Sequence, residues 1–212
     1  MPPIIISLEG NIGAGKSTLF NELKAVHPEW TFVDEPVDEW MTLRDSDGKS
    51  LLQKFYEDRR RWAYTFQITA LLSRSKALSR AADSQVIITE RSLDADRNVF
   101  AKMLSNEGEI NQLEWNLYQA WYDHVNTMCP KIDAFIHLDT PVTICDDRMR
   151  QRARAGENDI SVEYLDKLDN YHFAWLLDPA FKTPVLRYDN YSPKGQTSLK
   201  DVEEFVARLA QK

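Results

Sequence analysis

Residues 4–20, IIISLEGNIGAGKSTLF, contain the strongest signal in this sequence. A run of apolar residues predicts a buried strand, the glycine-rich segment predicts a tight turn, and the lysine and hydroxyl residues predict the beginning of a helix. The segment from Gly10 to Ser17 fits G-x-x-x-x-G-K-[ST], the P-loop. Its glycines let backbone N–H groups face phosphate oxygens, and the helix adds its positive end. The stretch therefore predicts a nucleoside triphosphate site.

In such a loop the lysine reaches the β- and γ-phosphates, and the hydroxyl after it holds Mg²⁺. Lys16 and Ser17 occupy these positions. A glycine turn with a surface lysine is the alternative, but the motif also follows a strand and opens a helix, as a P-loop requires. The candidate ATP-binding residues of the loop are Gly10, Asn11, Ile12, Gly13, Ala14, Gly15, Lys16, Ser17 and Thr18.

Short apolar runs alternate with longer helical patterns along the chain. Phe55, Trp62, Phe66 and Ala70 recur at near-helical spacing without Gly or Pro, which predicts one long helix over 51–81. Strands alternating with helices predict an α/β fold, with a parallel sheet covered on both faces and ligands at the carboxyl ends of its strands. The expected strands are 4–8, 31–34, 86–89, 133–138 and 184–188, and the other expected helices are 15–25, 94–105, 111–127, 142–152, 161–177 and 199–210.

Length and composition limit the classes of protein to consider. The 212 residues are 43% hydrophobic and 28% charged, which is typical of one globular domain, and we place it over 1–212. A formal net charge of −7 argues against a nucleic acid polymer as partner. No apolar run is long enough for a membrane helix, two cysteines show no pairing pattern, and the first strand leaves no room for a leader. We therefore expect a cytoplasmic protein without a membrane partner.

Acidic residues follow two of the expected strands. The segment VDEPVDEW (33–40) contains Glu35, whose carboxylate Pro36 could aim into a cleft by favouring extended backbone. A solvated acidic turn is the alternative. The segment VIITERS (86–92) ends a buried strand with Glu90 and Arg91, which could join a Mg²⁺ site and bind phosphate. A salt-bridged end of the strand is equally compatible with that pattern.

Four arginines, at 148, 150, 152 and 154, lie within DDRMRQRARAGEND (146–159). On a helix, Arg148 and Arg152 share one face, whereas Arg150 and Arg154 share another. A charge run is usually a solvated face, but beside a P-loop these arginines, running into a segment with a glycine, favour a lid over about 148–160.

Together these stretches resemble the deoxynucleoside kinase family, which includes deoxycytidine, deoxyguanosine and mitochondrial thymidine kinases. The match covers nearly the whole chain in the family's order: GNIGAGKST, DEPVDEW, FYEDRRRWAYTFQ, LSR, TERSLDADRNVF, RQRARAGE and EYLDKL. The resemblance implies a P-loop kinase fold with five parallel strands. It also implies a homodimeric enzyme that transfers phosphate from ATP, with Mg²⁺, to the 5′-hydroxyl of a deoxynucleoside in nucleotide salvage.

The resemblance also implies roles at the phosphate end of the site. Glu35 matches the general base that deprotonates the 5′-hydroxyl, and Arg91 matches the arginine that bridges this hydroxyl and the transferring phosphate. Lys16 completes the expected catalytic set, and Ser17 and Glu90 are the expected metal ligands. Lid arginines match Arg148, Arg152 and Arg154, and the two groups that hold the sugar 3′-hydroxyl match Tyr56 and Glu157.

At the base end, Gln67 matches the glutamine that binds the Watson–Crick edge of the base. Phe66 and Phe100 would stack on the base, although ordinary core packing is the alternative for such aromatics. Arg74 lies two helical turns after Gln67, so both can reach one cavity. Ala70, Arg74 and Asp96 follow the cytidine- and guanosine-type pattern, so we expect cytosine or purine bases over thymine. We also expect Arg74 and Asp96 to form a charged pair at the far end of the base pocket that excludes thymine. The remaining apolar wall is expected from Ile12, Val37, Trp40, Leu52 and Phe55.

Two positions depart from the family pattern. Phe55 is bulkier than the usual methionine, and Arg59 stands where relatives often have proline. The rival interpretation is a nucleoside monophosphate kinase of thymidylate-kinase type, which needs a cation for the acceptor's phosphate. The acids around Glu35 would repel that phosphate. For the homodimer, the helices 51–81 and 111–127 would offer apolar surface to the other subunit through Trp115, Leu117 and Trp121, unless these residues are buried within one subunit.

Overall fold

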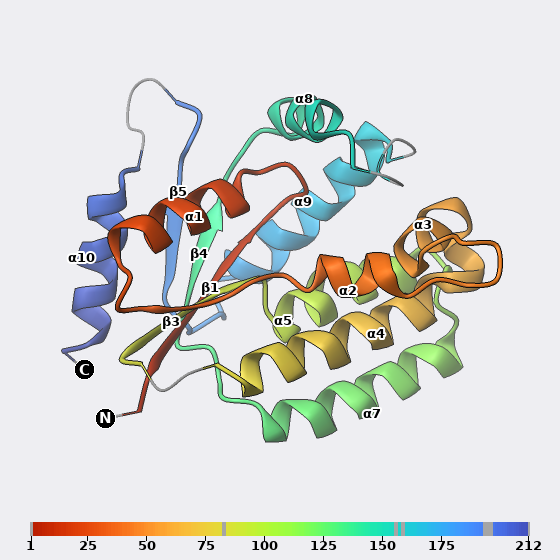
Figure 1. The fold of residues 1–212 in the computed structure, drawn as a ribbon, viewed down its shortest axis with the longest axis horizontal. Coiled ribbons are helices and arrows are strands. Elements are labelled where there is room, and N and C mark those ends of the chain that lie inside the picture. The colour runs from red at the N-terminus through yellow and green to blue at the C-terminus, as the bar shows by residue number, and fades with distance from the viewer. Residues whose placement is uncertain (1, 82–83, 155–156, 158–159, 193–196, 212) are drawn as a thin grey trace.

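The computed structural model describes residues 2–81, 84–154, 157, 160–192 and 197–211. Its centre is a five-stranded sheet in the order β2-β3-β1-β4-β5, in which every neighbouring pair is parallel. The P-loop strand therefore occupies the middle of the sheet, as Figure 1 shows. The predicted α/β class and all five predicted strands are confirmed: β1 (Ile4–Gly10), β2 (Thr31–Val33), β3 (Val86–Glu90), β4 (Ala134–Leu138) and β5 (Val185–Tyr188).

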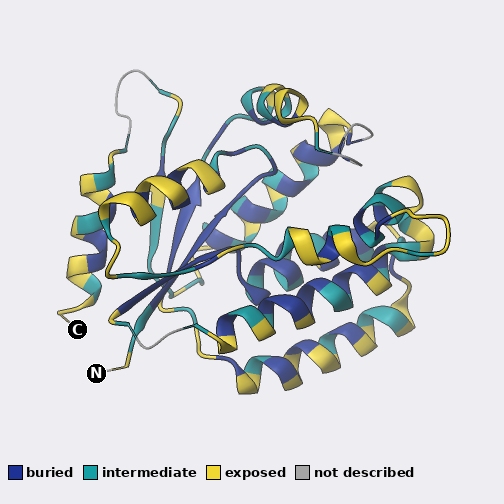
Figure 2. Cartoon of the chain, in the orientation of Figure 1, coloured by how far each residue is buried: buried dark blue, intermediate teal, exposed yellow. Residues whose placement is uncertain are grey.

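Two hydrophobic clusters cover the two faces of the sheet, because alternate strand residues point to opposite sides. Ile5 and Ile87 belong to the cluster under α4 (Arg59–Ser79) and α7 (Gln112–Met128). Ile6 and Ile88 belong to the cluster under α1 (Lys16–Val26) and α10 (Leu199–Leu209). Figure 2 shows the central strands as the most continuously buried part of the chain.

The other helices lie over the sheet's carboxyl edge or beside it, as Figure 1 shows. The helices predicted at 15–25, 111–127, 142–152, 161–177 and 199–210 are confirmed to within a residue or two. The remaining elements are α2 (Val37–Thr42), α3 (Leu51–Glu57), α5 (Leu93–Ala95), η1 (Asp96–Ala101), α6 (Lys102–Asn106), α8 (Val142–Arg152) and α9 (Val162–Leu176).

No described helix is long and apolar enough to cross a membrane. Cys129 and Cys145 are buried free thiols.

The prediction of one long helix over 51–81 is wrong, because the helix is interrupted at Asp58. Asp58 has φ −144° and ψ 79°, outside the helical range, and its carboxylate accepts a hydrogen bond from the N–H of Arg61 at 3.1 Å. This is the N-cap arrangement that aspartate favours. Because the interruption separates α3 from α4, each of the two helices can direct a different face toward the pocket described below.

Replacing Asp58 with alanine is expected to destabilise the fold by about 1 kcal/mol, because the first turn of α4 loses its side-chain cap. The free energy of unfolding in urea would measure this loss. Asp123→Ala, at an exposed position inside α7, is the matched control and should change the free energy by less than about 0.5 kcal/mol. Equal effects of the two substitutions would show that the cap adds nothing.

The helix predicted over 94–105 contains a wide turn that the sequence pattern did not indicate. Between α5 and α6, residues Asp96–Ala101 form the π-helical segment η1. Such segments are rare and frequent at functional sites. Here η1 places both Asp96 and Phe100 on the wall of the pocket described below.

Candidate functional site

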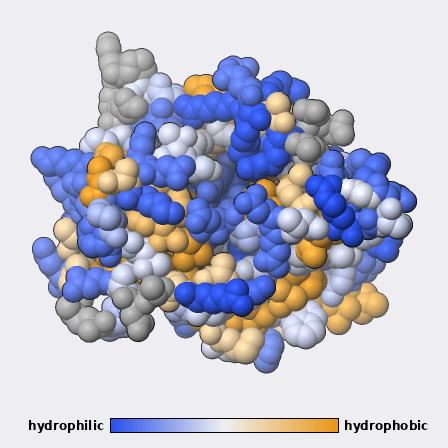
Figure 3. Space-filling view, in the orientation of Figure 1, coloured by the Kyte–Doolittle hydropathy of each residue, from blue (hydrophilic) through white to orange (hydrophobic). Residues whose placement is uncertain are grey.

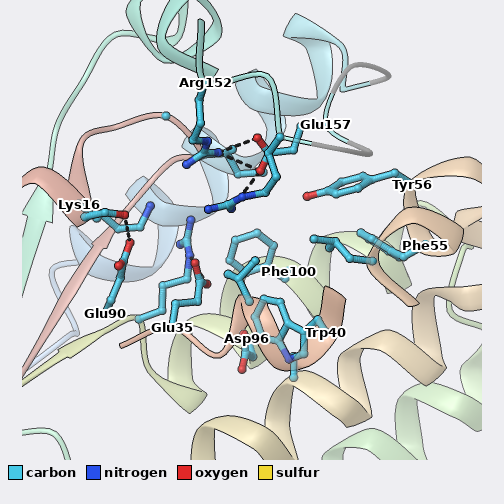
Figure 4. A pocket seen from close by; sticks show the side chains of 18 of the residues that line it. Lys16, Glu35, Trp40, Phe55, Tyr56, Glu90, Asp96, Phe100, Arg152 and Glu157 are labelled. Carbon is cyan, nitrogen blue, oxygen red and sulfur yellow. Dashed lines mark hydrogen bonds and ion pairs between the residues drawn. The ribbon is translucent and has the colours of Figure 1, made fainter. Parts of the chain in front are cut away.

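A pocket of about 490 Å³ lies at the carboxyl ends of β1 and β3, where ligands bind in parallel sheets of this type. It gathers nearly every predicted site residue (Figure 4). Gly10, Asn11 and Ala14 do not line it, and Tyr164 was not predicted. The lining residues are Ile12, Gly13, Gly15, Lys16, Ser17, Thr18, Glu35, Val37, Trp40, Leu52, Phe55, Tyr56, Phe66, Gln67, Ala70, Arg74, Glu90, Arg91, Asp96, Phe100, Arg148, Arg152, Arg154, Glu157 and Tyr164.

The P-loop at one end requires glycine for steric reasons. Gly13 has φ +79°, and a Cβ atom there would lie 2.2 Å from the carbonyl oxygen of Cys145. The Lys16 ammonium donates to the carbonyls of Asn11 at 2.7 Å and Gly10 at 3.3 Å. Burial, followed by repulsion from Arg91, lowers the pKa of Lys16 to about 7. An anion in the loop would offset both effects and favour the charged lysine.

Behind the loop, Asn11 connects it to another element. Its side-chain Nδ2 donates to the carbonyl of Leu165 in α9 at 2.8 Å, and its side-chain Oδ1 accepts from the N–H of Ile12 at 2.9 Å. Asn11 therefore supports the shape of the loop from outside the pocket, which is why it does not line the cavity although the motif contains it.

Oxygen donors for a cation stand beside the loop. The Ser17 hydroxyl donates to the Glu90 carboxylate at 2.8 Å, so the two side chains converge from α1 and β3. Both are hard oxygen ligands of the kind that Mg²⁺ takes. The two predicted metal ligands thus fit such an ion in chemistry and placement.

The carboxylate of Glu35 lies between two arginines, from α4 and from the end of β3. Its Oε1 accepts from Arg74 Nη2 at 2.6 Å and contacts Arg91 Nε at 3.3 Å. No hydrogen bond from a described residue reaches its Oε2. Burial raises the pKa of Glu35, but the charges of Arg74, Arg91 and Lys16 outweigh burial and bring it down to about 2. Glu35 is therefore an ionised carboxylate with one oxygen held in place.

Arg91 has an unusual backbone conformation. Its φ is +65°, in the left-handed region that residues other than glycine seldom adopt. Its N–H donates to the carbonyl of Leu8 at 3.1 Å, and the Thr89 hydroxyl donates to its carbonyl at 2.9 Å. Its guanidinium lies 4.7 Å from the ring centre of Phe100. The turn after β3 thereby directs a buried cation toward Glu35.

The predicted ion pair of Arg74 and Asp96 is confirmed, at 2.8 Å between Nε and Oδ2. Arg74 has further contacts that were not predicted: Glu35, as above, and the carbonyl of Glu90 at 3.2 Å. Burial raises the pKa of Asp96 to about 6 in spite of the nearby Arg74 charge. Arg74 thus connects the carboxylate of Glu35, near the phosphate end of the pocket, to the carboxylate of Asp96 at the far end.

Aromatic rings form the wall opposite the P-loop. Phe55 and Phe66 stack with centres 4.6 Å apart, and Trp40 meets Phe66 edge-on at 5.2 Å. These rings also belong to the main hydrophobic cluster, so the core and pocket interpretations of the aromatic residues both hold. Gln67 is 1% exposed, and its Oε1 has no hydrogen-bond partner among the described residues. A buried amide oxygen without a partner on a pocket wall indicates a missing polar ligand.

The predicted sugar and lid residues meet at the upper rim of the pocket (Figure 4). Glu157 is 4% exposed and accepts hydrogen bonds from Arg152, the shorter at 2.7 Å, and from Arg154 at 3.2 Å. Arg148 donates to the carbonyl of Ala14 at 3.1 Å. In contrast, Arg150 pairs with Asp146 at the surface. The lid positions 155–156 and 158–159 lie outside the described residues.

Three residues that contact the site were missed. Tyr164 lines the pocket, with the Arg59 guanidinium 4.7 Å from its ring centre, and Glu9 and His172 approach Arg91 from behind. Glu9 is the one acid in the apolar first strand, and Tyr164 lies within EYLDKL, so signals existed for both. His172 has no local signal, because only the packing of α9 brings it to Arg91.

Comparisons of the sequence with known proteins identify one family and several relatives. The sequence model of the family described as "Deoxynucleoside kinase" matches residues 6–211. Human deoxycytidine kinase is 35% identical, over 96% of this chain and 91% of the human protein. A probable deoxycytidine kinase of Fowlpox virus is 38% identical, over 96% and 88% of the two chains. The mitochondrial deoxyguanosine kinase of Xenopus laevis is 33% identical, over 96% and 90%.

Proposed function

This chain belongs to the deoxynucleoside kinase family and phosphorylates deoxynucleosides with ATP, and we propose that Glu35 is its general base and that thymidine is a poor acceptor. The single observation that carries the proposal is the position of Glu35, whose carboxylate lies in one pocket with the P-loop and the unpartnered amide oxygen of Gln67. We take 1–212 as one kinase domain, since the family model runs through 6–211.

Phosphoryl transfer needs an oriented nucleophile and compensated charge more than covalent help from the protein. Oε1 of Glu35 is fixed by two arginines, so Oε2 is the oxygen that accepts the proton of the 5′-hydroxyl. Arg91 lies beside it and stabilises the charge that develops on the transferred phosphoryl group. When ATP enters the loop, the Lys16 ammonium exchanges its hydrogen bonds to the carbonyls of Gly10 and Asn11 for hydrogen bonds to phosphate oxygens.

Ser17 and Glu90 are the residues that would hold Mg²⁺. When bound, the ion neutralises phosphate charge and orients the triphosphate for in-line attack. The Ser17–Glu90 hydrogen bond holds the two side-chain oxygens together beside the P-loop. Arg148, Arg152 and Arg154 supply positive charge at the rim, and Tyr56 and Glu157 would hold the sugar 3′-hydroxyl.

Base preference follows from the far end of the pocket. The Gln67 amide offers a donor and an acceptor, so it can meet the Watson–Crick edge of cytosine or of a purine. The buried Arg74–Asp96 pair occupies space near the base, and Arg74 cannot withdraw without leaving the buried Asp96 unpaired. We therefore propose deoxycytidine and purine deoxynucleosides as preferred acceptors.

The function is tested by measuring phosphorylation of the four natural deoxynucleosides with ATP and Mg²⁺. We expect turnover of deoxycytidine, a purine deoxynucleoside or both, with thymidine at the bottom of the ranking. The competing monophosphate kinase would instead turn over deoxynucleoside monophosphates and leave nucleosides unchanged. Activity on thymidine equal to that on deoxycytidine would overturn the proposed preference without affecting the family.

We also propose a homodimer through α4 and α7. Figure 3 shows apolar side chains gathered on the lower surface, where α4 and α7 lie in Figure 1. Leu117 and Trp121 are 45% and 49% exposed, close to the 47% of Leu72 on the neighbouring α4. Trp115 contributes less, because it is half-buried and stacks on Tyr118 at 5.8 Å. Apolar residues concentrated on adjacent helices are typical of a subunit interface.

Light scattering is expected to give a mass of twice 24.6 kDa at micromolar concentration. Leu117→Lys combined with Trp121→Lys should return the mass to 24.6 kDa, because it places two charges on the proposed interface. Leu43→Lys is the control, since Leu43 is also 45% exposed but lies outside α4 and α7. A wild-type mass of 24.6 kDa would contradict the dimer.

A further inference from the structure

The buried guanidinium of Arg91 has two edges with different neighbours. Its Nε faces the Glu35 carboxylate at 3.3 Å. Its Nη1 points away from the pocket, toward His172 Nε2 at 3.5 Å and Glu9 Oε2 at 4.0 Å. Arg91 is 4% exposed, so water cannot satisfy these donors freely. The groups behind Arg91 therefore help to determine where its front edge lies.

The protonation of His172 follows from its hydrogen bonds. Its Nδ1 lies 2.7 Å from the carbonyl oxygen of Leu168, which can only accept, so Nδ1 carries the proton. In a neutral imidazole the other nitrogen then has a lone pair, and this Nε2 faces Arg91, which can only donate. Burial, followed by the charge of Arg91, lowers the pKa of His172 well below its usual range. The ring is thus a neutral acceptor.

Packing fixes the His172 ring in place. The residue is 0% exposed, and its ring is stacked on His137 at 5.9 Å with the planes 12° apart. Phe100, which lies under the Arg91 guanidinium, meets the His172 ring edge-on at 6.2 Å. A ring held on several sides can direct the group that it binds. Its 3.5 Å contact is long, but hydrogen bonds around catalytic groups often shorten when substrate binds.

We propose that His172 is a positioning residue for phosphoryl transfer. Its Nε2 accepts a hydrogen bond from Nη1 of Arg91, and this bond holds the Nε edge of the guanidinium against Glu35. The proposal rests on the function proposed above. His172 lies on α9, whose Leu165 carbonyl also binds Asn11 of the P-loop. One rigid helix thus supports both the phosphate loop and the arginine, and it fixes the distance between them.

Three substitutions separate the two hydrogen bonds of the ring. In His172→Gln, an amide oxygen can replace Nε2 as acceptor for Arg91, whereas His172→Asn can replace only the bond to Leu168. His172→Phe removes both bonds and keeps a ring. We expect kcat for the best deoxynucleoside to fall at least tenfold in the Asn and Phe variants, and less than threefold in the Gln variant. The KM for ATP should stay within about twofold of wild type.

His137→Phe is the matched control, because His137 is a buried histidine stacked on the same ring without a contact to Arg91. It should leave kcat within about twofold of wild type, whatever it does to the melting temperature. A purely structural His172 would instead give equal losses of melting temperature in all three variants with kcat unchanged. That result, or a Gln variant as slow as the Phe variant, would overturn the proposal.

The second measurement places His172→Phe in an Arg91→Lys background, where lysine lacks the Nη1 group. If His172 acts through Arg91, the tenfold loss should shrink to less than about twofold, since coupled residues are not additive. A tenfold loss in both backgrounds would overturn the proposal even if one single variant folded poorly. A wild-type enzyme inactive on every deoxynucleoside would reject the proposed function itself, so the two failures are distinguishable.

Discussion

Replacing Glu35 with glutamine is expected to lower kcat by about 10²–10⁴-fold, the usual contribution of a positioned general base. The amide keeps the shape of the side chain and an oxygen for Arg74, but it cannot take the proton of the 5′-hydroxyl. Because Glu35 has no hydrogen bond or ion pair to the described residues of the P-loop, where we propose that ATP binds, the affinity for ATP should change less than about threefold. Steady-state kinetics with the best deoxynucleoside and a nucleotide-binding titration would measure the two quantities.

The neighbouring acid Glu39 supplies the matched control. Glu39 lies on α2 and is exposed, so Glu39→Gln makes the same chemical change without touching the pocket. We expect its kcat within about twofold of wild type. A Glu35→Gln variant that keeps most of its kcat would remove Glu35 from the mechanism, whereas loss of ATP binding in that variant would indicate a disturbed pocket.

The residues that line the pocket could be predicted from the sequence better than the contacts between them. The P-loop has a fixed spacing, and the apolar runs are short and β-branched, so the strands and the phosphate end were predictable. The Arg74–Asp96 pair was also predictable, from the family pattern and from the helical spacing of Arg74 and Gln67. A pattern along the chain gives the face on which a residue lies, but it gives no distance between faces of different elements.

Two of the missed contacts depend on such distances, whereas the missed helix break has a local cause. The contact between Arg74 and Glu35 requires α4 to lie beside the end of β2, and that placement comes from the packing of the aromatic cluster. The break at Asp58 was hidden because the apolar spacing continues through it, while the cap is a single polar side chain. The contact of His172 with Arg91 depends on how α9 packs against the sheet.

The triple contact of Arg74 changes what a test of base preference must measure. Arg74→Met with Asp96→Ala removes both buried charges and, with the base bound as proposed above, would open space beside C5 of a pyrimidine. Because Arg74 also holds Glu35 at 2.6 Å, the double substitution should lower kcat for every acceptor. The informative quantity is therefore the ratio of kcat/KM for thymidine to that for deoxycytidine, in which the shared loss cancels.

We expect this ratio to rise at least tenfold, equivalent to about 1.4 kcal/mol of transition-state discrimination. Arg74→Met alone leaves Asp96 buried without its partner, so it should damage stability more than the double change does. Asp96→Ala alone should cost less, because Arg74 keeps its ion pair with Glu35. Arg74→Met with Asp96→Asn is the matched control: it also removes both charges, but the asparagine fills the space that alanine would open. If the ratio rises only with alanine, steric exclusion of the thymine methyl is responsible. A ratio that stays flat in both double variants, while their melting temperatures fall, would mean that the pair only joins α4 to η1.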